Sequence, residues 1–472
     1  MKIIDLARQA TEFDEDNSAP AFSQEDLALQ FAARHHGELR YVDAWKWWLL
    51  WDGKRWHHDE TRNTFSMARR LCREFAGRLN KSKDARDIAS AKTRAAVVSL
   101  AGEDRRIAAT VDQWDTDLWL LNTPGGVVDL RTGSVRAHRP EDYMTKLTAV
   151  APDAACPTPG WFAFLKKVTD ADVELESYLQ RMCGYALTGS TREHALFFLY
   201  GGGGNGKSDL LSTAAGVLGE YSKIAPIETF TATNHDRHPT ELAKLRGARL
   251  VTAIETEAGR QWAEARIKAL TGGDKITARF MRQDFFEYIP QFKLLIAGNN
   301  KPGLRSVDEA MKRRFNLIPF EVNIPKDERD LELAEKLKGE WPGILAWMVT
   351  GCLAWQQKGL APPNVVVAAT EAYLESEDTF NQWLEECCRV GASEWCALAD
   401  LFFVHKKWAA AANIDAGTEK ALGNQLATRF KRAKRGRGSP RGFIGLTVFK
   451  PQTEPQNGEA PKKAEPIWVA PF

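Results

Sequence analysis

The residue types that bind nucleotide phosphates occur together at residues 201–208, which read Gly-Gly-Gly-Gly-Asn-Gly-Lys-Ser. This segment fits the phosphate-loop pattern G-x-x-x-x-G-K-[ST] at every fixed position. Glycines let consecutive backbone N–H groups turn towards an anion, and the N-terminus of a following helix adds positive charge. Lys207 can then reach the β- and γ-phosphates, and Ser208 can place its hydroxyl on Mg²⁺.

The elements on either side of this segment separate a phosphate loop from a flexible glycine linker, which is the alternative. An apolar, aromatic run at 194–200 predicts a buried strand before the loop, and a helix-like stretch follows the loop. A phosphate loop requires both elements, whereas a linker requires neither. We therefore predict ATP and Mg²⁺ as cofactors, bound by Gly201, Gly202, Gly203, Gly204, Asn205, Gly206, Lys207 and Ser208.

Two glutamates follow the next buried-strand pattern along the chain. The run 250–254 ends in Glu255 and Glu257, which are separated by Thr256. In a phosphate-loop ATPase one carboxylate can hold Mg²⁺ through water, and one can orient or deprotonate the attacking water. We expect Glu255 at the metal and either glutamate as the base; the alternative is a pair of solvated glutamates at a strand edge.

A third strand pattern, at 292–297, ends in Asn299 and Asn300. A neutral amide at this strand end can position the attacking water without adding negative charge. Arg313 and Arg314 then follow at the end of a short predicted helix. Either both are surface arginines, or one of them is an arginine finger that reaches the nucleotide of a neighbouring subunit.

Cations and an aromatic residue lie between the acidic and the asparagine strands. Lys275, Arg279, Phe280 and Arg282 follow a Gly-Gly-Asp turn and sit among β-forming residues. This pattern predicts a projecting hairpin, which could grip a phosphate backbone and stack on bases. The alternative is a charged surface ribbon.

A second basic cluster lies near the C-terminus. Residues 429–441 hold seven basic residues and no acidic one. We predict a wing that lies on DNA phosphates, or alternatively a solvated loop. The candidate contacts are Lys431, Arg432, Lys434, Arg435 and Arg437.

Composition limits the classes of function. The 472 residues carry 64 Lys and Arg against 62 Asp and Glu, a formal net charge of +2, so nucleic-acid contacts must come from such local clusters. Seven cysteines without a paired framework suit a reducing cytosol. No apolar run approaches the length of a membrane span, and the first residues turn acidic where a signal peptide needs an apolar run. We therefore expect a protein that is neither exported nor membrane-spanning.

The order of these parts resembles the superfamily 3 helicases, specifically the phage and plasmid primase/helicase family. The parts are the phosphate loop, the Glu-Thr-Glu strand, the basic hairpin, the strand ending in Ala-Gly-Asn-Asn, and Arg-Arg-Phe. The resemblance extends over most of the chain. It implies an ATP-dependent motor that assembles as a ring, usually a hexamer, and translocates on single-stranded DNA. It assigns the sensor role to Asn299, the channel hairpin to Lys275, and the finger to Arg313 or Arg314.

The resemblance also implies the fold class, an α/β protein with an AAA+-type phosphate-loop core. The expected parts are a disordered N-terminus (1–22), an α+β N-terminal region (23–155), the superfamily 3 motor (156–365), a winged-helix-like DNA-binding domain (366–450) and a disordered tail (451–472). In the N-terminal region, tryptophans around Asp52 and Gly53 predict a hairpin with a small hydrophobic core, rather than a base-stacking surface.

The expected function is therefore that of a ring-forming DNA helicase in the cytoplasm of a bacterial host, serving replication of a phage or mobile element. Expected partners are single-stranded and forked DNA, other copies of the chain, and a separate primase, polymerase or initiator. Members of this family often carry a polymerase-like primase domain. The only Asp-x-Asp segment near the start of this chain, Asp14-Glu15-Asp16, lies outside any strand pattern. We therefore expect no primer synthesis. The alternatives are a phosphate-loop ATPase for DNA packaging or segregation, and a DNA-binding initiator that remodels origin DNA.

Overall fold

A computed structural model describes residues 19–232, 240–255, 260–282, 284–304, 307–427, 429–434 and 440–449, with Glu255 described by its backbone alone. The chain divides into two compact units, with the boundary between Leu374 and Glu375. Most of the predicted N-terminal disorder and the whole predicted tail lie outside the described residues. None of the described helices combines the length and apolar character needed to span a membrane.

A five-stranded parallel sheet forms the centre of the first unit. Its order is β13-β7-β12-β9-β8, and every neighbouring pair is parallel. The strands are β7 (Leu196–Tyr200), β8 (Ser222–Ile224), β9 (Leu250–Glu255), β12 (Lys293–Gly298) and β13 (Phe315–Pro319). Continuous apolar runs form these strands because a parallel sheet is covered on both faces.

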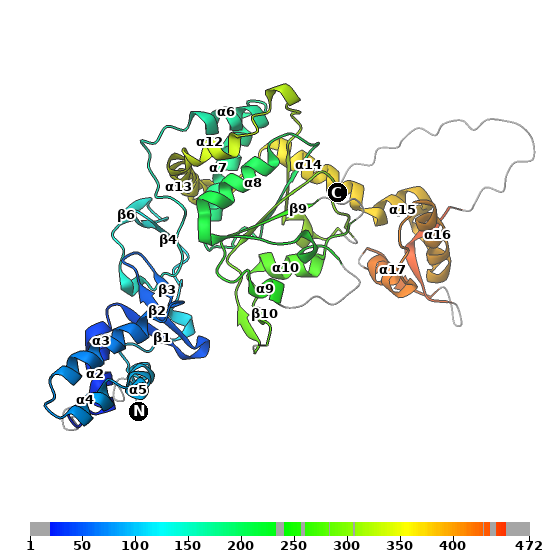
Figure 1. The fold of residues 1–472 in the computed structure, drawn as a ribbon. Coiled ribbons are helices and arrows are strands. Elements are labelled where there is room, and N and C mark those ends of the chain that lie inside the picture. Colours follow the sequence, from blue (N-terminus) through cyan, green and yellow to red (C-terminus); the bar gives the residue numbers. More distant parts are fainter. Residues whose placement is uncertain are drawn as a thin grey trace, which may run out of the picture. The chain divides into compact units, whose positions relative to one another are not determined.

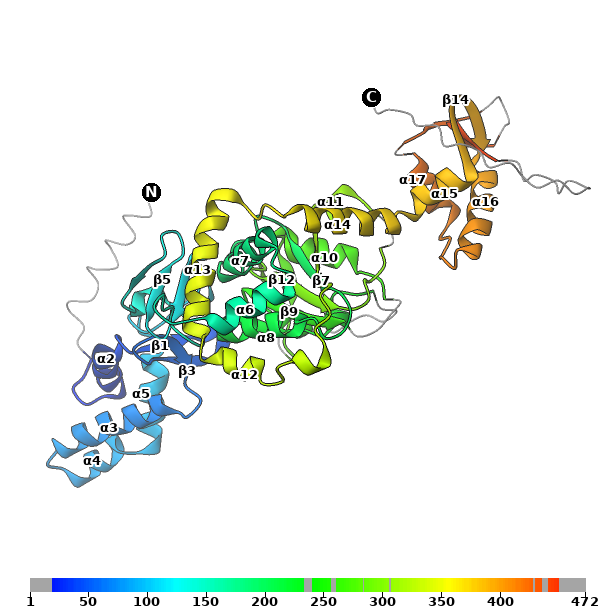
Figure 2. The ribbon, with the colours of Figure 1, turned by 90° about the horizontal axis from the view of Figure 1, so that it is seen from above.

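Helices cover both faces of this sheet (Figure 1). One face packs against α6 (Pro159–Val168), α7 (Val173–Leu187), α8 (Lys207–Leu218), α12 (Leu333–Lys338) and α13 (Trp341–Lys358). The other face carries α9 (Thr240–Ala243), α10 (Glu264–Gly272) and α11 (Glu309–Lys312). Successive side chains of β7 point to opposite faces of the sheet. Phe197 and Leu199 therefore pack in the core beneath α7 and α8, and Phe198 packs in the core beneath α10. Helices α7 and α13 lie side by side (Figure 1, Figure 2), and α14 (Asn364–Glu377) follows them in the chain.

The residues before α6 form a helical layer and two small antiparallel sheets. The helices are α2 (Gln24–His35), α3 (Asn63–Gly77), α4 (Ser82–Ile88) and α5 (Ala91–Ala101). The sheets are β1 (Leu39–Val42), β2 (Trp47–Trp51) and β3 (Trp56–His58), and β4 (Leu120–Thr123), β5 (Gly126–Asp129) and β6 (Ser134–Arg136). Trp56 is fully buried and packs with Val42, Leu49 and Trp114, so this tryptophan supplies a core as predicted. Trp47 keeps 45% of its surface exposed.

The second unit has the order helix, strand, helix, helix, strand, strand. Its elements are α15 (Thr379–Cys387), β14 (Cys388–Ala397), α16 (Leu398–Ala411), α17 (Glu419–Leu426), β15 (Lys431–Ala433) and β16 (Gly442–Val448). The strands form an antiparallel sheet in the order β14-β16-β15. Its core contains Trp383, Leu401 and Phe443, together with the thiols of Cys388 and Cys396.

Candidate nucleotide and DNA sites

The phosphate-loop segment connects β7 directly to α8, as predicted. Gly206 is the N-cap of α8 and has φ +82°, a conformation that glycine adopts without strain. A Cβ on this residue would lie 2.5 Å from Val168 and 2.8 Å from Phe164, both on α6. Glycine is therefore required here both by the backbone and by the packed helix, and the N–H groups of the loop lead into the positive end of α8.

The ammonium group of Lys207 is held inside the loop. Its Nζ donates hydrogen bonds to the carbonyl oxygens of Gly201 (2.7 Å) and Gly202 (2.9 Å). It also donates to the side-chain oxygens of Asn205 (2.9 Å) and Asn299 (3.1 Å). Lys207 is 7% exposed, and its burial lowers the pKa of the ammonium group. The cation predicted for phosphates and the amide predicted for water are thus in direct contact.

The register of the sheet explains why these side chains meet. Gly298 of β12 pairs with Tyr200 of β7 on one side and with Glu255 of β9 on the other. The three strands therefore end at the same level, and the phosphate loop and Asn299 leave the sheet at one edge. The backbone of Glu255 lies at this edge, while Glu257 falls outside the described residues.

The oxygens at this edge suit Mg²⁺. Ser208 lies on the first turn of α8 and is exposed. Hydroxyl, carboxylate and water oxygens are the ligands that Mg²⁺ prefers, and it shares them with nucleotide phosphates. Ser208 supplies an exposed hydroxyl of this kind, while the side chains of Glu255 and Glu257 are not among those that the structure describes.

The two predicted finger arginines differ in their surroundings. Arg314 is 5% exposed, its Nε donates to Thr271 Oγ1 at 3.0 Å, and its guanidinium also bonds the Ala310 carbonyl. Burial lowers its pKa. Arg313, the C-cap residue of α11, is exposed. The carbonyl of Arg314 accepts from Leu196, the first residue of β7, so both arginines lie at the opposite end of β7 from the phosphate loop.

The predicted hairpin is present after the Gly-Gly-Asp segment. Strands β10 (Ile276–Ala278) and β11 (Phe286–Tyr288) pair antiparallel. The Gly-Gly-Asp segment ends α10 instead of forming the turn, with Gly273 in the left-handed conformation. Lys275 is therefore exposed at the base of the hairpin, directly before β10.

The tip of this hairpin is cationic and aromatic. Arg279 lies 4.6 Å from the ring centroid of Phe285, and Phe280 stacks on Phe286 with centroids 5.8 Å apart. Phe280 is 38% exposed and Phe285 59% exposed, and Arg282, two residues after Phe280, is also exposed. The sequence analysis missed Phe285, whose role depends on its place across the turn from Arg279.

The basic cluster of the second unit is described only in part. Lys431 and Arg432 lie on β15 and Lys434 follows it, whereas Arg435 and Arg437 fall outside the described residues. Arg432 donates to the Gly423 carbonyl (2.9 Å) and to the Asn424 side chain (2.8 Å) of α17. Lys431 and Lys434 are exposed, as is Arg441 at the end of the cluster, so these three cations of the described cluster are available to a ligand.

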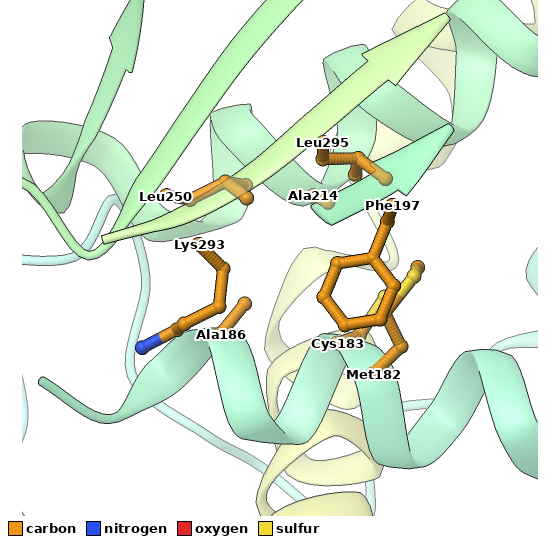
Figure 3. Close-up of a pocket in the computed structure, with 8 residues that line it drawn as sticks. All are labelled: Met182, Cys183, Ala186, Phe197, Ala214, Leu250, Lys293 and Leu295. Atoms are coloured by element: carbon orange, nitrogen blue, oxygen red, sulfur yellow. The ribbon is translucent and has the colours of Figure 1, made fainter. Parts of the chain in front are cut away.

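A small cavity lies away from these sites, between α7 and the sheet (Figure 3). Its volume is about 10 Å³, and Cys183, Phe197 and Leu295 are among its lining residues. A single water molecule already needs roughly this volume. The cavity is a packing defect of the core, too small for a nucleotide.

Lys293 borders this cavity, and its nitrogen points away from Phe197 (Figure 3). It is 2% exposed, and its Nζ donates to the carbonyls of Thr188, Ser190 (3.3 Å) and Gln291 (3.3 Å). Burial holds the pKa of this ammonium group well below its usual value. Lys293 begins β12, so it lies at the opposite end of that strand from Asn299.

Two family models match parts of the sequence. Residues 28–170 match a family described as D5 N terminal like. Residues 199–314, which include the phosphate loop and the hairpin, match a family of unknown function, DUF5906.

Viral proteins named as helicases are similar to part of the chain. The protein of Acanthamoeba polyphaga mimivirus is 26% identical over 319 residues, which are 62% of this chain and 33% of that protein. The protein of Frog virus 3 (isolate Goorha) is 26% identical over 298 residues, 59% of this chain and 30% of that protein. The chain therefore spans about a third of the length of these relatives.

The fold is also similar to a solved structure, the apo structure of the NrS-1 C-terminal region. The TM-score is 0.51 at 11% sequence identity, and the match covers 89% of this chain and 99% of that chain. At this identity the likeness concerns the fold, a mixed α/β architecture with a parallel central sheet.

Proposed function

We propose that this chain is an ATP-dependent DNA helicase of the superfamily 3 type, with an AAA+-type core. The observation that carries the proposal is the contact between Lys207 and Asn299 at the common end of β7, β12 and β9. Strand β12 separates the phosphate-loop strand from the acidic strand. An amide at its end is therefore suited to hold water between a terminal phosphate and a carboxylate base. The helicase names of the viral relatives support the same reading.

The residues of the chain have distinct roles in this proposal. Lys207 exchanges its loop oxygens for the β- and γ-phosphates of ATP, and the loop N–H groups bind the same phosphates. Mg²⁺, held through Ser208 and Glu255, supplies charge neutralisation when bound. Asn299 orients the attacking water, and Glu255 or Glu257 accepts its proton.

The finger role is proposed for Arg313. Arg314 is buried and bonded to residues of its own chain. Arg313 is exposed, at the opposite end of β7 from the phosphate loop. An arginine in that position cannot serve its own site and suits the site of a neighbouring copy. This supports assembly as a ring, for which we propose a hexamer.

DNA is proposed to contact the hairpin and the second unit. Lys275 at the hairpin base and Arg279, Phe280 and Arg282 at its tip combine charge for phosphates with a surface for base stacking. In the second unit, the order of elements supports a winged-helix-like domain, whose basic segment includes Lys431 and Lys434. A separate primase, polymerase or initiator is a further proposed partner.

The first test is ATP hydrolysis by the purified protein with and without single-stranded DNA. We expect DNA to stimulate hydrolysis, and Lys207→Ala to abolish hydrolysis under both conditions because the phosphates lose their cation. Lys223→Ala changes an exposed lysine on β8 and serves as the matched control. Hydrolysis that is indifferent to DNA would instead support a phosphate-loop ATPase with another role.

A further inference from the structure

The segment after β13 is bonded along the phosphate loop. The N–H of Phe320 donates to the Tyr200 carbonyl at 2.8 Å, and the N–H of Ile324 donates to the Gly204 carbonyl at 3.1 Å. The side-chain amide of Asn205 donates to the Phe320 carbonyl. Residues far downstream of the loop therefore form one of its walls.

Arg329, at the end of this segment, lies against the loop backbone. Its Nε donates to the Ile324 carbonyl at 2.8 Å, which fixes the root of the guanidinium. A Cβ on Gly204 would lie 2.1 Å from Nη2 and 2.2 Å from Cζ of Arg329, so the guanidinium occupies the space beside the glycine. Gly204 also has φ +74°, so a side chain is excluded there on two grounds.

The charge of Arg329 is not neutralised by a described carboxylate. Within the described ranges no Asp or Glu forms an ion pair with it, and the adjacent Glu328 pairs with Lys167 at 2.7 Å. Among the hydrogen-bond partners that the described ranges offer this guanidinium, the one besides Ile324 is Asn323 Oδ1, at the long distance of 3.5 Å. A half-buried guanidinium with open donors beside a phosphate-binding loop is suited to a phosphate, which it can bind in a bidentate manner.

We propose that Arg329 is a phosphate-binding residue that acts in the same chain as Lys207, contacting the polyphosphate of the bound nucleotide from its place beside Gly204. This inference rests on the nucleotide site proposed above. It adds a second cation to that site. This cation belongs to the same chain as the phosphate loop, whereas the proposed arginine finger belongs to a neighbouring copy.

The test is equilibrium binding of fluorescent ATP and ADP analogues to the full chain. Arg329→Gln keeps a hydrogen-bond donor without charge, and we expect it to weaken binding by about 10- to 100-fold, the range of a hydrogen bond to a charged group. Arg329→Lys retains the charge and should recover part of the affinity. Lys326→Gln removes an exposed cation of the same segment and should bind as the wild type does.

Two further readouts separate phosphate binding from support of the loop. The salt dependence of ATP affinity should become weaker in Arg329→Gln, because one charged contact is lost. If the Gln variant binds as the wild type does, or if its loss follows a lowered melting temperature with unchanged salt dependence, the role of Arg329 is wrong. Lys207→Ala distinguishes the two proposals. If Lys207→Ala loses binding and Arg329→Gln does not, the nucleotide site is supported and the role of Arg329 is wrong. If the wild type binds neither analogue, both proposals are wrong.

Discussion

At the scale of single residues, the same side-chain type has different roles according to burial and partners. Lys207 and Lys293 are both buried. Lys207 is the first residue of helix α8, and Lys293 is the first residue of strand β12. Lys207 is bonded to the loop and to Asn299, at the end that is proposed to bind nucleotide. Lys293 donates to the carbonyls that follow α7, and so it satisfies backbone acceptors at the negative end of that helix.

Replacement of Lys293 by methionine tests this structural role. Because burial lowers the pKa of Lys293, the unfolded chain binds more protons between that lowered pKa and the ordinary lysine value of about 10.4. The free energy of unfolding of the wild type therefore gains a positive slope with pH in this window, and Lys293→Met lacks that slope. We expect the variant to be less stable by about 1–3 kcal/mol, from acceptors left without a donor, with a deficit that widens as pH rises.

Thermal unfolding of both proteins between neutral and alkaline pH measures this difference. The exposed Lys223→Met is the matched control and should show a deficit that does not change with pH. A deficit of Lys293→Met that stays constant across the range would contradict the assigned protonation behaviour.

At the scale of elements, the sequence predicts those features that depend on neighbours along the chain. The apolar run 194–200 contains strand β7, the run 292–297 covers all of strand β12 except Gly298, and the glycine pattern correctly marked the start of α8. The hairpin was predicted correctly, whereas the Gly-Gly-Asp segment before it ends helix α10, because Gly273 gives the same signal when it ends a helix as when it makes a turn. Arg329 was missed because its contact with Gly204 requires the returning segment after β13, which no local pattern predicts.

The hairpin provides a prediction at this scale. Removal of both tip charges in Arg279→Ala/Arg282→Ala should lower the affinity for single-stranded DNA and reduce the slope of its salt dependence by roughly 1.4, because each phosphate contact contributes about 0.7. Basal ATP hydrolysis should be unchanged, since neither arginine is among the residues proposed to bind or hydrolyse ATP. Fluorescence anisotropy over a range of salt concentrations measures both quantities.

Two single variants complete this comparison. Thr277→Ala, on the exposed face of β10, should bind DNA as the wild type does. Lys275→Ala is expected to spare basal hydrolysis and lose unwinding, and it tests whether the base of the hairpin contributes as well. An unchanged salt slope in the double variant would exclude the tip as a DNA contact.

At the scale of the whole molecule, the chain alone does not bring all proposed catalytic groups together. Lys207 and Asn299 share one edge of the sheet, whereas Arg313 is exposed near the first residue of β7. Because Arg314 is used internally, completion of the site by Arg313 requires a second copy. An arginine finger typically contributes about 10³-fold or more to hydrolysis, so an isolated chain should be a poor ATPase.

The most direct measurement of the central claim is strand displacement on a forked DNA duplex with ATP. The wild type should unwind the duplex, and Lys207→Ala and Arg313→Ala should each fail alone. A mixture of the two variants should recover part of the activity, since some sites then combine an intact Lys207 with an intact Arg313 from the neighbouring copy. Wild-type protein that hydrolyses ATP without displacing a strand would contradict the helicase assignment and favour a motor for another DNA task.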